Sequence, residues 1–281
     1  MRVWRSPVSP FGARLVAASA LVVFCGAAPG LATRSADPPL SPDQIREFLL
    51  TAKIVKHKDL GKGITRPIRL TLTDGTLTHD AVFSSVQETQ SVMKYASGQT
   101  ELDFVDSYAY NIAAYRLAGL LGLDGMMPVT VEREWDHRKG SLAWWIDHTM
   151  DEQERLTKKI QPPDREDWNR QMYRMRVFAQ LVADTDRNLG NVLIGPDWKL
   201  WMIDFTRAFR HTRKLLAPGD LQRCDRQLLA RLRELTAEAV EAKTKPFIDR
   251  AEIEPLMARR DAIVTTIEKL VAERGEDRVL Y

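Results

Sequence analysis

An amphipathic helix that runs directly into a polar loop and a short apolar hairpin is the feature that most constrains this chain. Apolar residues recur at helical spacing over about residues 168–183, which predicts one helix with a buried face. The polar loop 184–191 follows, and the apolar runs 192–194 and 200–203 are joined by a Gly-Pro-Asp turn. These runs predict a β-hairpin. The helical repeat consists of Met172, Met175, Ala179 and Val182.

The polar residues of this loop and hairpin carry the chemical signal. Asp186 and Asn191 lie in the loop, and Asp204 follows the second apolar run. Because Asn191 and Asp204 begin and end one hairpin, we expect their side chains to converge. Amide and carboxylate oxygens suit Mg²⁺ or Mn²⁺, which bridges nucleotide phosphates. Taken one at a time, the same residues fit an ordinary helix end, a polar turn and a strand-end acid.

The segment before this helix predicts a small lobe with an antiparallel sheet. Three strands form a meander, a helix ended by Gly122 follows, and two more strands complete the lobe. Residues 103–106 are expected to lead into that helix. Five antiparallel strands with one such helix make an α+β lobe. The predicted elements are a first helix over 42–50 capped by Ser41, strands at 52–55, 68–72 and 81–83, a helix over about 107–121, and strands at 128–131 and 141–146.

The domain organisation follows from these elements. From about Asp220 onward the leucine pattern predicts mainly helices, so the second lobe is mainly α with one hairpin. The predicted divisions are a signal peptide at 1–32, a linker at 33–44, an N-terminal lobe at 45–150 and a mainly helical C-terminal lobe at 151–281.

The first residues have the design of a secretory signal peptide. The basic residues Arg2, Arg5 and Arg14 precede the apolar run 15–28. Small residues stand at the −3 and −1 positions of a cleavage site after Ala32. The apolar run is shorter than the roughly 20 residues that span a bilayer. We therefore expect an exported protein, periplasmic or secreted, without stable membrane insertion after cleavage; lipid anchoring at Cys25 stays open.

Charge and cysteine content exclude several classes of protein. The chain has 41 basic and 38 acidic residues, and three of the basic ones lie in the predicted signal peptide. The mature chain would therefore be neutral, which gives no electrostatic case for nucleic acid or an anionic membrane as a partner. Cleavage would leave only Cys224, so neither an internal disulfide nor a cysteine metal site is expected.

The motif D-R-x-x-x-N at Asp186–Asn191, followed by I-D-F at Ile203–Phe205, resembles the catalytic and metal-binding segments of the atypical protein-kinase-like superfamily. It is similar to phosphatidylinositol 3-/4-kinases, HipA-type kinases and the secretory-pathway casein kinase. The resemblance implies a two-lobed kinase-like fold, ATP as the nucleotide and Mg²⁺ or Mn²⁺ as the metal. By position, Asp186 would orient or deprotonate the acceptor hydroxyl, Arg187 would brace the loop, and Asn191 and Asp204 would hold the metal.

The first lobe departs from the kinase pattern. Aligned with V-A-I-K, the run at 81–83 is followed by Ser84 where a lysine is expected, and Asn111 stands near the place of its glutamate partner. Gly61, Lys62 and Gly63 offer a substitute that reaches phosphate, although Gly-x-Gly is also an ordinary tight turn. Two other lysines are candidates for the same role, Lys53 and Lys94.

Two functions remain open from the sequence. The first is a metal-dependent phosphotransferase that acts on a hydroxyl of an unknown protein or small-molecule acceptor. The second is an exported pseudokinase, a binding scaffold that keeps the fold without phosphotransfer, which Ser84 and Asn111 favour.

Overall fold

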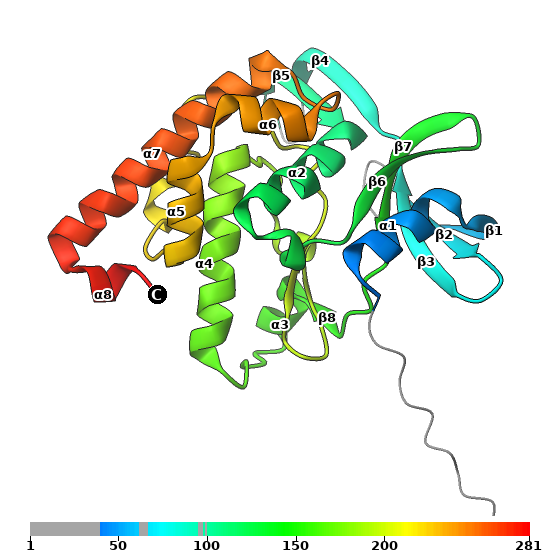
Figure 1. Cartoon of the computed structure of the whole chain (residues 1–281), viewed down its shortest axis with the longest axis horizontal. Coiled ribbons are helices and arrows are strands. Elements are labelled where there is room, and N and C mark those ends of the chain that lie inside the picture. The colour runs from blue at the N-terminus through cyan, green and yellow to red at the C-terminus, as the bar shows by residue number, and fades with distance from the viewer. Residues whose placement is uncertain (1–39, 62–66, 95–97, 99) are drawn as a thin grey trace, which may run out of the picture. The chain divides into compact units, whose positions relative to one another are not determined.

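The computed structural model describes residues 40–61, 67–94, 98 and 100–281 (Figure 1). The predicted signal peptide and two of the predicted phosphate-binding residues, Lys62 and Gly63, lie outside the described residues. Among the helices of the described part, none combines the length and the apolar composition that crossing a bilayer requires.

The first lobe contains the predicted five-stranded antiparallel sheet. Its strand order is β1-β2-β3-β7-β6. Leu72 on β2 and Phe83 on β3 are fully buried, and helix α1 covers them with Phe48 and Leu49. Burial alternates along β2 and β3, so one face of the sheet is apolar and the other faces away from α1. The elements are α1 (Pro42–Thr51), β1 (Lys53–Asp59), β2 (Ile68–Thr73), β3 (Thr78–Ser84), α2 (Tyr108–Leu121), β6 (Thr130–Trp135) and β7 (Arg138–Trp144).

Both helices of this lobe begin and end at residues that the sequence marks. Ser41 Oγ accepts a hydrogen bond from the Gln44 N–H at 3.2 Å, and Gln44 Oε1 accepts one from the Ser41 N–H at 2.8 Å, which completes a capping box. Ser107 caps α2, and Gly122 ends it with a left-handed φ of 68°. The predicted boundaries of both helices are therefore confirmed within two residues.

Residues 103–106 lead directly into helix α2, as predicted, but the sequence did not show that they form a strand. They belong to β5 (Thr100–Ser107), which pairs with β4 (Gln87–Lys94) in a separate two-stranded hairpin outside the five-stranded sheet (Figure 1). The two strands are rich in polar residues and mostly exposed, so no apolar alternation marks them in the sequence. The pairing skips Ser91 and Asp103, and Asp103 has a φ of 51°, which breaks the strand period further.

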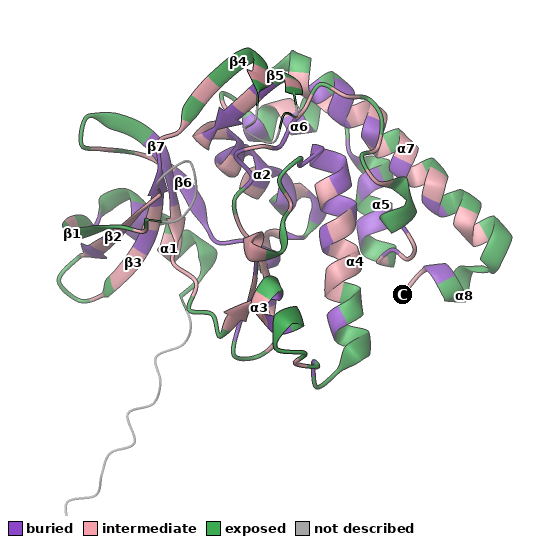
Figure 2. Ribbon diagram, turned by 180° about the vertical axis from the view of Figure 1, so that it is seen from behind, coloured by how far each residue is buried: buried purple, intermediate pink, exposed green. Residues whose placement is uncertain are grey.

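The second lobe is mainly helical and is organised around α4, which confirms the predicted central helix. Its C-terminal half is buried, with Met175, Phe178 and Leu181 in the core, and it packs against α7 (Figure 2). Strands β9 and β10 form the predicted hairpin, and β8, which the sequence did not predict, adds a third strand beside β9. The helical C-terminal region begins at Arg226 and not at about Asp220. The elements are β8 (Met150–Asp151), α3 (Glu152–Thr157), α4 (Arg165–Val182), β9 (Val192–Ile194), β10 (Leu200–Met202), α5 (Arg226–Glu234), α6 (Ala237–Thr244), α7 (Arg250–Arg274) and α8 (Glu276–Val279), with short 3₁₀ helices η1 (Asp124–Met126), η2 (Leu189–Asn191) and η3 (Pro218–Asp220).

Candidate active site

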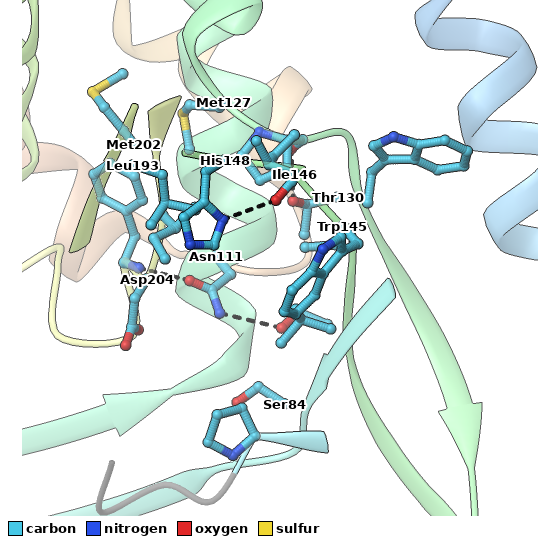
Figure 3. A pocket seen from close by; sticks show the side chains of 18 of the residues that line it. Ser84, Asn111, Met127, Thr130, Trp145, Ile146, His148, Leu193, Met202 and Asp204 are labelled. Carbon is cyan, nitrogen blue, oxygen red and sulfur yellow. Dashed lines mark hydrogen bonds between the residues drawn. The ribbon is translucent and has the colours of Figure 1, made fainter. Parts of the chain in front are cut away.

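A cavity of about 230 Å³ lies between the five-stranded sheet and the β9–β10 hairpin (Figure 3). Its walls are largely apolar and come from both lobes, including Val82 on β3, Leu193 on β9 and Met202 on β10. Trp144 and Trp145 also line it. An apolar cavity that is open at one side and bounded by a few polar groups suits the base and sugar of a nucleotide.

Strand β3 presents Ser84 to this cavity. Val82 and Ser84 line the cavity, whereas Ala81 and Phe83 point to the buried core beneath α1. This alternation directs the side chain at position 84 into the cavity. Ser84 is buried, and its Oγ has no hydrogen-bond partner within the described residues. The space in which kinases carry a lysine is therefore bounded here by a small neutral hydroxyl.

The rest of this wall is also neutral. Asn111 Oδ1 accepts a hydrogen bond from the Phe205 N–H at 2.7 Å, and Asn111 Nδ2 donates to Ser141 Oγ at 3.2 Å (Figure 3). Asn111 thus joins α2 to the chain just after Asp204 and to β7. No lysine or arginine is among the described residues that line the cavity. A positive charge beside a ligand in this cavity would therefore come from a metal ion or from residues other than these lining residues.

The lysines that the sequence offered as substitutes lie away from the cavity or outside the described residues. Lys53 on β1 and Lys94 on β4 are exposed and do not line the cavity. Leu60 and Pro67 do line it, so the connection that carries Gly61 begins and ends at the cavity. Gly61 has a left-handed φ of 60°, and its N–H donates to Asp59 Oδ1 at 2.8 Å.

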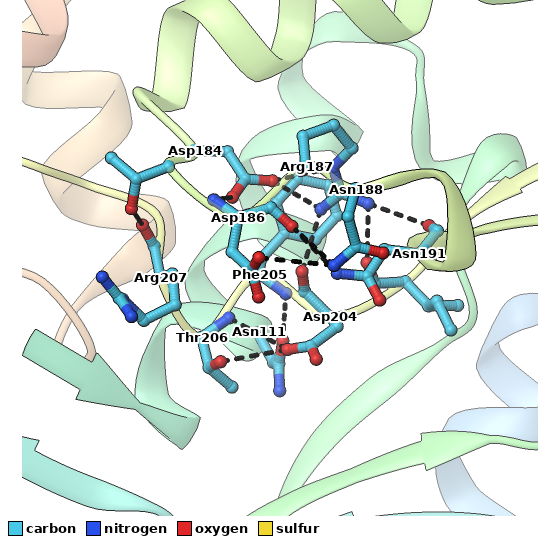
Figure 4. A network of polar contacts seen from close by, with 12 residues as sticks. Asn111, Asp184, Asp186, Arg187, Asn188, Asn191, Asp204, Phe205, Thr206 and Arg207 are labelled. Atoms are coloured by element: carbon cyan, nitrogen blue, oxygen red, sulfur yellow. Dashed lines mark hydrogen bonds and ion pairs between the residues drawn. The ribbon is translucent and has the colours of Figure 1, made fainter. Parts of the chain in front are cut away.

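Arg187 braces the loop that follows α4. Its Nε donates to Asp184 Oδ2 at 2.7 Å, and its Nη1 donates to the carbonyls of Asn191 and Ile203 at 2.9 and 2.7 Å (Figure 4). Its Nη2 donates to the Asp204 carbonyl at 2.9 Å. The guanidinium also lies 4.2 Å from the centre of the Phe205 ring. Through these contacts Arg187 fixes the loop 184–191 to the β9–β10 hairpin. Its donors are used within the protein.

Asp186 and Asn191 lie on the exposed side of this loop. Asn191 Nδ2 donates to the Asp186 carbonyl at 3.0 Å, which leaves the Asn191 side-chain oxygen available as a ligand. The Asp186 carboxylate accepts a hydrogen bond from Asn188 Nδ2 at 3.3 Å. Asp186 is exposed and does not line the cavity, so a molecule can approach it from solvent without entering the cavity.

Asp204 occupies the edge of the cavity in a constrained backbone conformation. Its φ is 55°, a left-handed value that Asp and Asn adopt more readily than most residues. Oδ1 accepts a hydrogen bond from Thr206 Oγ1 at 3.0 Å. The carboxylate is open to solvent on one side, yet protein atoms surround it on the others, and this burial raises the pKa of Asp204 above its usual range. Such a carboxylate gains from a nearby cation.

Asp106, a residue that the sequence did not mark, lies beside Asp204. It is buried near the end of β5, and burial raises its pKa, partly offset by a hydrogen bond with Thr206 and reinforced by the negative charge of Asp204. Its Oδ1 has no hydrogen-bond partner in the described part of the chain. The two acids come together because the Ser107 N–H donates to the Thr206 carbonyl at 2.9 Å, a long-range backbone contact.

These residues fit a divalent metal of the Mg²⁺ type. A buried carboxylate oxygen without a partner is costly unless a ligand or proton meets it. The described residues contain no group of three His, Cys, Asp or Glu side chains that would form an all-protein metal cage. Mg²⁺ and Mn²⁺ do not need one, because one or two carboxylates, substrate phosphates and water complete their coordination. Asp204, Asp106 and the Asn191 amide match that requirement.

Comparison with known proteins identifies the fold. No protein-family model matches the sequence, and no curated protein matches it significantly. The structure of hydra Fam20 with sugar resembles the chain with a TM-score of 0.63 at 13% identity, covering 85% of this chain and 91% of that one. The Golgi casein kinase with Mn/ADP bound gives a TM-score of 0.59 at 15% identity, covering 85% and 78%.

At identities this low, the similarity shows the architecture alone. The cavity and the loop 184–191 both lie where the two lobes of that architecture meet. The antiparallel sheet with α2 forms one lobe, α4 to α8 form most of the other, and the cavity lies where the two meet. The chain has a two-lobed kinase-like fold, similar to that of Fam20 and of the Golgi casein kinase.

Proposed function

We propose that this protein is a metal-dependent phosphotransferase that moves the terminal phosphoryl group of a nucleotide, ATP in the first instance, to a hydroxyl acceptor. The observation that carries the proposal is the unpartnered buried oxygen of Asp106 next to Asp204, which lines the cavity between the lobes. The kinase-like fold supports it, as does the Mn/ADP complex of the Golgi casein kinase, whose fold is similar.

Asp204, Asp106 and Asn191 are the residues that would hold the metal. When bound, the metal would neutralise phosphate charge. Asp186 is proposed to orient the acceptor hydroxyl and to accept its proton as the acceptor oxygen bonds to the γ-phosphorus. The bond from that phosphorus to the bridging oxygen breaks, and the nucleoside diphosphate leaves with the bond's electrons. Arg187 is proposed to act by holding Asp186 and Asp204 in register, as its contacts indicate.

The proposed setting is outside the cytoplasm, periplasmic or secreted, with the signal peptide 1–32 removed. The acceptor is proposed to be a protein or small molecule of that compartment, and neither nucleic acid nor a membrane is a proposed partner. Sequencing the N-terminus of the protein recovered from its host tests cleavage, because an intact Met1 would contradict it.

A thermal-shift titration with ATP and MnCl₂ tests the proposed site, with Asp106→Asn as the informative variant. A ligand that binds only the folded state stabilises it by about 2.7 kcal/mol at 100 times its Kd, so the melting temperature of the wild type should rise when both are present. In Asp106→Asn we expect the apparent Mn²⁺ affinity to fall about tenfold, which corresponds to about 1.4 kcal/mol.

Asp103→Asn is the matched control for that variant. Asp103 lies on the same strand, is exposed, and has a left-handed φ that asparagine tolerates. It should leave the Mn²⁺ titration unchanged. Equal Mn²⁺ titrations for Asp106→Asn and the wild type would remove Asp106 from the metal site, and no shift in the wild type would remove the site itself.

The protein has no lysine at position 84 to contact the nucleotide phosphates. We also propose that this contact is made instead by Gly61, Lys62 and Gly63. The support is that Leu60 and Pro67, on either side of these residues, both line the cavity. Lys62→Ala is expected to raise the KM for ATP about tenfold, the size of one charge-assisted contact of about 1.4 kcal/mol. Lys58→Ala, an exposed position on β1, is the control. Identical KM values for both variants would assign the three residues to an ordinary turn.

A pseudokinase is the second candidate function, and the neutral wall of Ser84, Asn111 and Ser141 favours it. Without a cation in that wall, the phosphates bind less tightly and are less well aligned for transfer. A clear ATP and Mn²⁺ shift without phosphotransfer to any hydroxyl acceptor or to water would favour this function. Measurable turnover that depends on Asp204 would exclude it.

A further inference from the structure

Arg259 on α7 is a fully buried arginine without an acidic partner in the described part of the chain. Its side chain is 0% exposed, and burial lowers its pKa to about 10, so it remains charged at neutral pH. No carboxylate pairs with it among the described ion pairs, and its Nη2 has no hydrogen-bond partner in the same part of the structure. A buried cation that is neutralised by no acid is costly, so its contacts must account for its presence.

The contacts of Arg259 are all backbone carbonyls from two segments near the candidate site. Nε donates to the carbonyl of Leu181 at 2.8 Å, in the last turn of α4. Nη1 donates to the carbonyl of Arg210 at 2.9 Å and to that of Thr212. Leu181 lies just before the loop that carries Asp186, and Arg210 lies just after Asp204. One side chain therefore joins the two segments that position the two site acids.

Further hydrogen bonds and ion pairs hold residues 207–210, which follow Asp204. The Phe209 N–H donates to the Val182 carbonyl at 2.5 Å, and the Thr185 N–H donates to the Arg207 carbonyl at 3.3 Å. On the other side, Arg207 and Arg210 both pair with Glu101 on β5, at 2.5 and 2.8 Å. These contacts connect residues 207–210 both to the end of α4 and to β5.

We infer that Arg259 is a positioning residue that holds residues 205–212 in their working geometry, so that the site is assembled without phosphorylation of that segment. In kinases whose corresponding segment is disordered, a phosphorylated side chain orders it through new arginine contacts. Here the arginine comes from the helical lobe and uses carbonyls that are present in the unmodified chain. Three donor bonds from one planar group fix both segments at once.

Limited trypsin digestion of Arg259→Met tests this without reference to activity. Trypsin cuts after Arg210, Arg213 and Lys214, which all lie in or beside the segment. Methionine fills much of the buried volume but cannot donate to the three carbonyls, so we expect cleavage at these sites to become at least tenfold faster at a temperature well below unfolding. Peptide mass spectrometry identifies the sites.

Arg260→Met is the matched control, because Arg260 is the next residue on α7 and donates to the carbonyls of Leu232 and Leu235, at the end of α5. It is expected to leave cleavage after Arg210 at the wild-type rate. Equal cleavage rates in the two variants would overturn the inference. If Arg259→Met does not fold, Arg259→Lys serves in its place, since lysine keeps the charge but cannot reach all three carbonyls; wild-type protection in that variant would also overturn it.

A kinetic measurement, which rests on the proposed function, separates positioning from binding. Arg259 does not line the cavity, so Arg259→Met should keep the ATP and Mn²⁺ thermal shift while kcat falls about 10- to 100-fold. An unchanged kcat alongside faster cleavage would overturn the claim that this geometry matters for transfer. If the wild-type protein shows no turnover, the proposed function is contradicted. The trypsin digestion then still tests whether Arg259 holds residues 205–212.

Discussion

Asp204→Asn is expected to abolish phosphotransfer and the Mn²⁺-dependent thermal shift together. The substitution removes a carboxylate that lines the cavity and is proposed to hold the metal. A loss of about 4 kcal/mol of transition-state stabilisation corresponds to about a thousandfold in kcat/KM. Asparagine is the right replacement because the residue has a φ of 55°, which asparagine tolerates. The fold should therefore survive, and the melting temperature without ligand should stay close to that of the wild type.

Asp197→Asn provides the comparison for this variant. Asp197 lies in the turn of the same hairpin, is exposed, and accepts a hydrogen bond from the Lys199 N–H at 3.1 Å, which an asparagine oxygen can also accept. It should leave both measurements unchanged. Wild-type phosphotransfer in Asp204→Asn would sink the metal-dependent mechanism.

Asp186→Asn is expected to separate catalysis from nucleotide binding. An asparagine side chain cannot accept the acceptor proton, so we expect kcat to fall by about 10²- to 10⁴-fold, the usual size of a general-base contribution. The contact to Asn188 Nδ2 is retained by the asparagine oxygen, and Asp186 lies outside the cavity wall, so the ATP and Mn²⁺ thermal shift should persist.

Asp220→Asn, an exposed position in η3 on the helical lobe, controls for general effects of losing a charge. It should give wild-type kcat. If Asp186→Asn lost the thermal shift as well as kcat, Asp186 would belong to the nucleotide or metal site and would not act only on the acceptor.

Periodic sequence patterns predicted the elements that are buried on one side. Helix α4 has apolar residues at helical spacing, and strands β2 and β3 and the β9–β10 hairpin are apolar runs between turns; each was predicted within a few residues of its actual bounds. The sequence marked Ser84 only through its alignment with V-A-I-K, and the structure adds that this residue lines the cavity. The β4–β5 hairpin was missed because polar side chains cover it, and polar strands leave no apolar period.

The candidate site was predictable only where its residues are close in sequence. Asp186, Arg187, Asn191 and Asp204 come from one loop and one hairpin, so their spacing reveals them. Asp106 reaches Asp204 through the backbone bond from Ser107 to Thr206, which joins residues about a hundred positions apart. No local pattern distinguishes Asp106 from its neighbour Asp103, which is exposed. Tertiary pairing alone decides which of the two acids belongs to the site.

The neutral wall at Ser84 also decides which small molecules distinguish this protein from kinases that carry a lysine at the corresponding position. A competitive inhibitor whose affinity depends on an acceptor group facing a lysine ammonium would meet only the Ser84 hydroxyl here and would lose that contact. A compound with a compact donor aimed at the same place would find a buried oxygen that lacks a partner among the described residues. Selective inhibition can therefore be designed around one position on one strand.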